Sequence, residues 1–255
     1  IEGVSEAIGF LIMFTIVLTG IAMVSLVGYP MLIETQISSD ERNMEQAMIA
    51  IQNDMKILTF SNVPYRDSTI KVSGGTITTI DNGSSTQGFT ISDSAGMNRN
   101  FNLGEIQYES DEGTAVLTLM NGAIVKRDRF QSGSVMIAEP RWFYDKGEET
   151  LVIYLMTIQA DEKYYETGVG TVQMSMKKGP VTIDRDYMDL FGTTATITIK
   201  YSPDPNDDYS VAWRNYLTGN SIITTGFTDI GSNTYTLAGV ERLIIKNYNI
   251  KIESL

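Results

Sequence analysis

Histidine and cysteine are both absent from this chain of 255 residues. The absence of cysteine excludes disulfide bonds and thiol chemistry. The absence of histidine removes the commonest catalytic base and the commonest metal ligand, so serine and cysteine triads of the usual kind are excluded. We therefore expect a protein that is not an enzyme and that has no catalytic residues, no metal site and no cofactor.

Basic residues are few, with 19 Lys and Arg against 31 Asp and Glu, which gives a net charge of −12. This acidic balance argues against binding to the phosphate backbone of nucleic acid, and it favours a solvated, self-repelling exterior. Residues 204–208 form an acid-rich loop with oxygens of the kind that Ca²⁺ prefers. Their spacing does not match an EF-hand loop, so we expect a solvated turn with acids that cap a helix.

Charge is also absent from residues 7–33, a run of 27 residues between Glu6 and Glu34. Seventeen of them are Val, Ile, Leu, Met or Phe, and ~20 apolar residues suffice for a helix to span a bilayer. A helix that is apolar on all sides cannot bury that surface against itself. We expect a bilayer or other copies of the chain to cover it. A cleaved secretory signal is disfavoured, because the start is not basic and the apolar run is too long.

Small residues interrupt this run at Gly9, Gly20 and Gly28. In apolar surroundings small residues let helices approach closely, so these glycines are candidate assembly residues. The alternative is that Gly is simply commoner in membrane helices. Pro30 lacks a backbone N–H, and we expect it to bend or loosen the helix near residues 28–30.

Glu6 stands one turn before the apolar run, and no Lys or Arg precedes Arg42. A buried carboxylate without a partner would be costly. The obvious cation is the free α-amino group of Ile1 in a neighbouring copy, which makes Ile1 and Glu6 candidate assembly residues. The alternative is that Glu6 lies in the first turn of the helix, where the helix dipole favours an acid.

The segment Gly3-Val4-Ser5-Glu6-Ala7-Ile8-Gly9-Phe10, followed by the apolar run, resembles the mature N-terminus of archaeal type IV pilin-like proteins and the related archaellins. The resemblance implies a class III signal peptide that a prepilin peptidase removes. It also implies a helix that first anchors the precursor in the inner membrane, and that the pilus assembly machinery then packs into the core of an extracellular filament. The segments Ile106-Gln107-Tyr108 and Asn121-Gly122-Ala123-Ile124 are among those that resemble euryarchaeal surface proteins with pilin-like N-termini.

An amphipathic stripe follows the apolar run. Its apolar members recur at helical spacing and are Ile37, Met44, Met48, Ile51, Met55 and Leu58. We expect this stripe to seat the following domain, and Asn62-Val63-Pro64 to end the helix. The predicted organisation is a long hydrophobic helix over 1–62 and an extracellular head over 63–255.

From about residue 66 the pattern alternates, which predicts strands. They are 69–72, 76–81, 88–92, 114–120, 123–129, 135–138, 151–159, 170–177, 194–201, 222–227, 233–237 and 242–252. Asn82-Gly83 and Asn121-Gly122 each predict a type I′ hairpin, and residues 208–217 predict a short helix. The fold class is therefore α+β, with an antiparallel, sandwich-like head. Residues 177–180 are the candidate break between two sub-sheets.

Asn82-Gly83-Ser84 is also a sequon with a permitted middle residue. Because we expect it in an exposed turn of an extracellular protein, Asn82 is a candidate glycosylation site.

These features predict a structural subunit of a type IV pilus-like filament on an archaeal cell surface, which polymerises with identical subunits through its N-terminal helix. Adhesion or surface contact is the role that the resemblance implies. One alternative is an archaellum-type motility filament. The other is a monomeric, membrane-anchored surface protein with a ligand-binding head.

Overall fold

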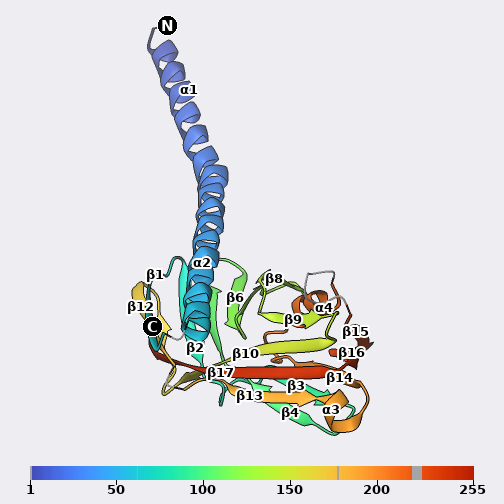
Figure 1. Ribbon diagram of the computed structural model, residues 1–255. Helices are drawn as coiled ribbons and strands as arrows, with labels where there is room; N and C mark the ends of the chain where they lie inside the picture. The colour runs from blue at the N-terminus through green and yellow to red at the C-terminus, as the bar shows by residue number, and fades with distance from the viewer. Residues whose placement is uncertain (1, 62, 177, 220–225) are drawn as a thin grey trace.

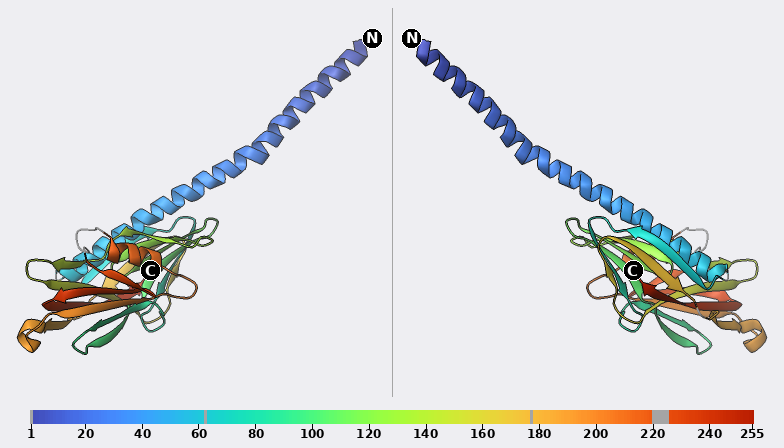
Figure 2. Two further views of the ribbon diagram at one scale, coloured as in Figure 1. Left: turned by 90° about the vertical axis from the view of Figure 1, so that its right-hand side faces the viewer. Right: turned by 90° about the vertical axis from the view of Figure 1, so that its left-hand side faces the viewer.

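One long helix leads into a β-rich head in the computed structural model (Figure 1). The structure describes residues 2–61, 63–176, 178–219 and 226–255, and it describes side chains from Ala7 onward. The helix comprises α1 (Glu2–Met23), a π-helical turn over Val24–Gly28, and α2 (Tyr29–Phe60). The head packs against α2 from about Ile37 onward, and α1 stands clear of it (Figure 2).

The π-helical turn lies directly before Pro30, which occupies the first turn of α2. The backbone N–H of Tyr29 donates to the carbonyl of Val24, five residues back. Because proline has no N–H and its ring crowds the preceding turn, a wider turn relieves the clash. The expected loosening of the helix near residues 28–30 is therefore confirmed, and the helix changes direction there (Figure 2).

The amphipathic stripe of α2 faces the head. Met44, Met48, Ile51, Met55 and Leu58 are all 0% exposed. They form one hydrophobic core with residues of the first and second sheets, defined below. The stripe thus seats the head, as its spacing predicts.

The described residues of the head form three sheets. The first has the order β1-β12-β17-β10-β9, with β13 also paired to β17. Its strands are β1 (Tyr65–Lys71), β9 (Trp142–Asp145), β10 (Thr150–Ala160), β12 (Val169–Ser175), β13 (Val181–Asp186) and β17 (Arg242–Ser254).

The second sheet has the order β11-β2-β5-β6-β7-β8 and the third has the order β15-β16-β14-β3-β4. The strands of the second are β2 (Gly75–Ile80), β5 (Glu105–Ser110), β6 (Ala115–Met120), β7 (Ala123–Asp128), β8 (Ser134–Ala138) and β11 (Tyr165–Glu166). Those of the third are β3 (Gly88–Asp93), β4 (Asn98–Asn102), β14 (Ala195–Ser202), β15 (Thr228–Gly231) and β16 (Thr234–Val240). The short helices are α3 (Tyr187–Phe191) and α4 (Ser210–Thr218), and α4 confirms the helix expected at 208–217.

Most strand pairs are antiparallel, as expected for an α+β protein of this kind, but β10 and β17 run parallel over eleven residue pairs. These two long strands join two cores. On β10, Met156 and Ile158 face the core under α2, whereas Leu151, Ile153 and Leu155 face a second core that includes residues of the third sheet and α4. The two cores of the head therefore share one continuous pair of strands.

The candidate break at residues 177–180 joins β12 to β13. Both strands pair with β17, β12 near its C-terminal end and β13 nearer its start. The segment therefore connects two strands of the same sheet. Lys177 itself lies outside the described residues.

Of the two expected hairpins, one is confirmed and one is wrong. Asn121 and Gly122 have φ of 53° and 68° and join β6 to β7, with Met120 opposite Ala123. Residues 82–83 have no positive φ, and they connect β2 in the second sheet to β3 in the third.

The reason for the failed hairpin is the preceding acid. Asp81 accepts the backbone N–H of Gly83 through its side chain and those of Ser84 and Ser85 through its carbonyl. Such local bonds compete with hairpin pairing. The strand expected at 222–227 falls largely on residues outside the described part, and Gly226 and Phe227 lie in no strand.

Candidate assembly surface

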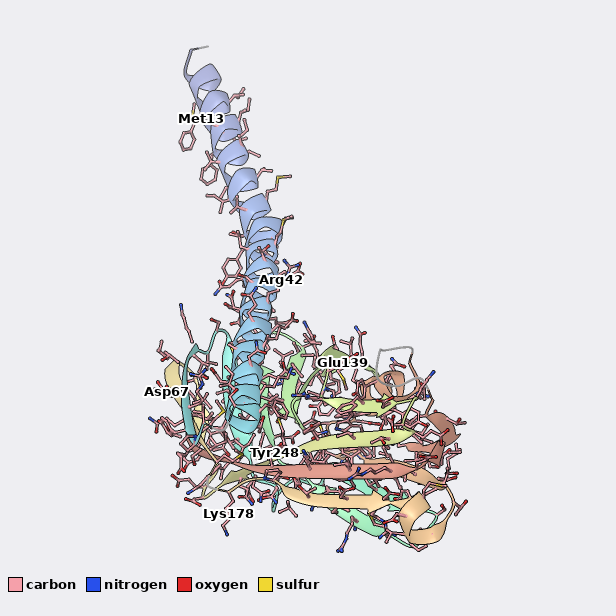
Figure 3. All side chains as sticks on the ribbon, viewed as in Figure 1. Met13, Arg42, Asp67, Glu139, Lys178 and Tyr248 are labelled. Atoms are coloured by element: carbon pink, nitrogen blue, oxygen red, sulfur yellow. The ribbon has the colours of Figure 1, made fainter. Side chains whose placement is uncertain are left out.

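The apolar run forms a bare helix whose side chains radiate in all directions (Figure 3). Apart from Ile33, which is partly buried, its large apolar side chains are between 48% and 77% exposed. They are Ile8, Phe10, Leu11, Ile12, Met13, Phe14, Ile16, Val17, Leu18, Ile21, Met23, Val24, Leu26, Val27, Tyr29, Met31 and Leu32. The helix is long and apolar enough to cross a membrane, with a window of mean hydropathy 2.6 that has no buried residue. The chain thus carries a candidate membrane anchor, and the head leaves it uncovered.

The two threonine hydroxyls within the run are satisfied by the helix itself. The hydroxyl of Thr15 donates to the carbonyl of Leu11, and that of Thr19 donates to the carbonyl of Thr15. Because these hydroxyls already have partners, the helix can enter apolar surroundings without leaving them unpaired.

Among the described residues, the glycines of the run make no close packing contact. A Cβ added at Gly9 or Gly20 would meet nothing within 4 Å, and one at Gly28 would come no closer than 3.8 Å to Val24 Cγ1. A mid-helix glycine is less stable than alanine by ~1 kcal/mol. Gly9 and Gly20 are eleven residues apart, which is about three turns, so they lie on one side of α1. Close approach by another helix would use this side.

Ile1 lies outside the described residues, and Glu6 belongs to α1 but its side chain is not among those described. The pairing of the Glu6 carboxylate with the amino group of another copy therefore stays a prediction.

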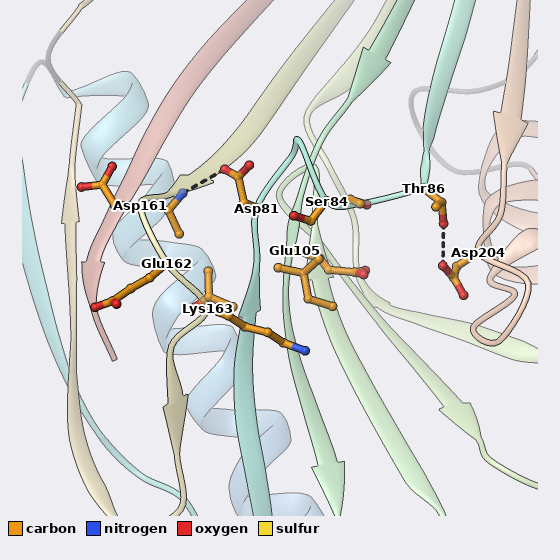
Figure 4. Close-up of a pocket in the computed structure, with 12 residues that line it drawn as sticks. Asp81, Ser84, Thr86, Glu105, Asp161, Glu162, Lys163 and Asp204 are labelled. Atoms are coloured by element: carbon orange, nitrogen blue, oxygen red, sulfur yellow. Dashed lines mark hydrogen bonds between the residues drawn. The ribbon is translucent and has the colours of Figure 1, made fainter.

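In the head, a cleft of about 420 Å³ lies between the loop after β2 and the loop after β10 (Figure 4). Glu105, at the start of β5, is 5% exposed and accepts a hydrogen bond from Gln87 Nε2 at 3.1 Å. Gln87 Oε1 in turn accepts the hydroxyl of Tyr201 at 2.6 Å. Burial, then the charges of Asp207 and Asp204, raise the pKa of Glu105 to about 8.

The acids of the loop 204–208 bind protein groups. Asp204 Oδ2 accepts the hydroxyl of Thr86 at 2.5 Å, which Figure 4 marks. Asp207 pairs with Arg127 Nη2 at 2.5 Å and accepts from Gln107 Nε2 at 2.8 Å. Asp208 accepts the backbone N–H of Ser210 at the start of α4. Within the part of the chain that the structure describes, no group of three or more acids could hold a metal ion.

A model of one protein family matches residues 2–253, from the apolar helix to the end of the head. The chain belongs to this family, a family of unknown function (DUF7289). No curated protein and no solved structure matches the chain.

In this member of the DUF7289 family, Asn82 lies beside Asp81 and Ser84, which line the cleft. Its side chain is partly exposed, and it makes no hydrogen bond with the described residues. Glycosylation of Asn82 stays a prediction, and the turn that holds Asn82 is not of the expected type.

Sequence reasoning missed Glu105. Along residues 105–110 polar and apolar residues alternate, which suggests a half-exposed strand, yet five of the six are buried. The loop 204–208 and Tyr201 supply the cover, and both lie about 100 positions away in the sequence. The only local signal was the alternation itself, which indicates a strand and not the burial of its polar side.

Proposed function

We propose that this protein is the structural subunit of an extracellular, type IV pilus-like helical filament that polymerises through its N-terminal helix. The observation that carries the proposal is the bare helix: it is apolar on all sides, joined to a packed head, and uncovered within the chain. The filament core would hold this helix among copies of itself, and the head would face outward. Before assembly the same helix would anchor the subunit in the membrane.

Two features support a filament over a plain anchor. Gly9 and Gly20 weaken the helix without an intrachain role, which suits close packing of helices. No Lys or Arg lies between the apolar run and Arg42, although membrane anchors usually carry basic flanking residues. Because lipid already hides apolar surface, the gain on assembly is helix packing together with pairing of Glu6.

The resemblance of residues 3–10 to archaeal pilin-like N-termini supports the rest of the proposal. A prepilin peptidase would process the precursor, and a pilus assembly machinery would add subunits to the filament. The proposed role is adhesion or contact with surfaces, and a motility filament of the archaellum type is a relative within the same class.

The test is assembly of the full chain after detergent is removed, followed by electron microscopy. We expect filaments from the wild type. We expect the Glu6→Ala variant to form filaments more slowly in this assay. In cells that make it, the variant should still be found in the membrane fraction. Glu34→Ala, at the other end of the apolar run, is the matched control and should assemble normally.

A second variant tests the glycine side of α1. Leucine at position 20 favours the helix, but its side chain occupies the space that Gly20 leaves for a neighbouring helix, so Gly20→Leu should reduce filament yield. Ile21→Leu keeps a side chain of the same size at the neighbouring position and should not reduce it. Normal yield from both Glu6→Ala and Gly20→Leu would remove these residues from the mechanism.

The second candidate function is that of a monomeric, membrane-anchored surface protein with a ligand-binding head. The cleft beside Glu105 favours it, because a concave site of about 420 Å³ is large enough for a small molecule. This alternative predicts single molecules in lipid vesicles and no fibre under any assembly condition.

A further inference from the structure

Three cations of this acidic chain lie together where α2 ends. The guanidinium of Arg141 is 4.5 Å from the ring centre of Phe60 and 5.2 Å from that of Tyr154. The amine of Lys246 is 5.8 Å from the same Tyr154 ring. Lys56 lies one turn before Phe60 on α2, so the two side chains share a side of the helix. Within the described residues, none of the three cations has a carboxylate within 4 Å.

Aromatic rings lie against two of these cations, Arg141 and Lys246. Phe60 meets Tyr154 and Tyr248 edge-on, at 5.3 and 5.7 Å between ring centres. Tyr154 and Tyr248 stack at 6.2 Å, and Figure 3 shows Tyr248 at the lower end of α2. Burial lowers the pKa of Lys56. We call this surface the cationic patch, formed by Lys56, Phe60, Arg141, Tyr154, Lys246 and Tyr248.

An opposite charge lies where the helix leaves the head. Asp40, Asp111 and Glu112 line a cleft of about 180 Å³ between α2 and the turns of the first two sheets. Asp40 lies against Gly74, and Asp111 and Glu112 are exposed. Among the residues that the structure describes, no Lys or Arg is within 4 Å of these three carboxylates. We call this the acidic cleft.

The two surfaces are displaced along one helix. Asp40 and Phe60 are twenty residues apart, which is ~30 Å along the axis and ~200° around it. A contact between the cationic patch of one copy and the acidic cleft of another joins two different surfaces. Such a contact leaves a free surface at each end, and it extends into an open fibre when successive rotations do not close a ring.

We propose that the cationic patch of each subunit docks against the acidic cleft of the next subunit along the filament. This inference rests on the proposed filament function and adds the contact between heads. Copies that each carry a net charge of −12 repel one another. The patch offers a neighbouring copy three cations with no carboxylate within 4 Å among the described residues, and the cleft offers three carboxylates. Pairing these charges fixes how each subunit is positioned and oriented relative to the next one along the filament.

The experiment reverses charge on each surface of the full chain. Arg141→Glu with Lys246→Glu makes the patch acidic, and we expect the critical concentration for assembly to rise by roughly tenfold or more. Arg99→Glu with Lys200→Glu is the matched control, since both residues are exposed and lie on the third sheet, away from α2. Thermal melting of each variant in detergent shows whether the head still folds.

The decisive comparison is whether combining the two charge reversals in one chain restores assembly. Asp111→Lys with Glu112→Lys should also block assembly when introduced alone. A chain that carries both reversed pairs regains complementary surfaces and should assemble near the wild-type concentration. The inference is overturned if the reversed patch assembles like the control, or if the doubly reversed chain fails to recover. Both of these results leave wild-type filaments intact, whereas absence of wild-type filaments would count against the proposed function itself.

Discussion

Replacing Glu105 by Gln should stabilise the head at alkaline pH and leave it unchanged in acid. Glu105 is 5% exposed, and burial together with the charges of Asp207 and Asp204 raises its pKa from 4.5 to about 8. Folding therefore favours the protonated carboxyl. Its contribution to stability is complete below pH 4.5 and is lost as pH rises through about 8. Glutamine stays neutral at every pH and can still accept the hydrogen bond from Gln87.

The magnitude follows from the two pKa values. Each pH unit between them is worth ~1.36 kcal/mol, so ionisation of Glu105 removes about 5 kcal/mol of folding free energy by pH 9. We expect wild type and Glu105→Gln to unfold at similar urea concentrations at pH 4.5. At pH 9 the variant should be more stable by several kcal/mol.

The assay is urea unfolding of the full chain in a non-ionic detergent between pH 4.5 and 9. Tryptophan fluorescence reports on the head, because Trp142 and Trp213 are both buried in the second core. Glu109→Gln is the matched control, since Glu109 lies on the same strand but is exposed and pairs with Arg129. Parallel pH profiles for wild type and Glu105→Gln would refute the reasoning.

Three further changes test the fold and the surface. Met48→Ala should cost ~2–5 kcal/mol in urea unfolding, because Met48 is 0% exposed between α2 and the head; a loss below 1 kcal/mol would contradict the seating of the head on the stripe. Gly122→Ala should cost ~1–2 kcal/mol, because the position has a φ of 68° and the new Cβ would lie 2.8 Å from Met156 Sδ; Gly179→Ala, where a Cβ meets nothing within 4 Å, is its control. In protein isolated from its native cells, mass spectrometry should find a glycan at Asn82 that Ser84→Ala abolishes, and an unmodified Asn82 would exclude it.

The long N-terminal helix could be predicted from the sequence because its signals are local. The apolar run, the stripe from Met44 to Leu58 and the effect of Pro30 each depend on residues within a few turns. Asn121-Gly122 is equally local, because both residues adopt the positive φ that a type I′ turn needs.

The features that escaped prediction depend on distant residues. Asn82-Gly83 has the same turn composition, but the side chain of Asp81 accepts the backbone N–H of Gly83 within the turn. The next strand, β3, also belongs to another sheet. The parallel pairing of β10 with β17 joins segments about 90 residues apart, and no alternation in either strand indicates its direction. The cationic patch likewise gathers side chains from α2, the segment before β9, and strands β10 and β17.

The most direct test of the filament proposal is helical reconstruction of the material that the full-length chain forms once detergent is withdrawn. The account predicts fibres with residues 7–33 of every subunit at the axis, wrapped by heads that touch through the patch and the cleft. Particles that stay single in lipid or detergent, with no fibre containing the protein on cells that make it, would contradict the account.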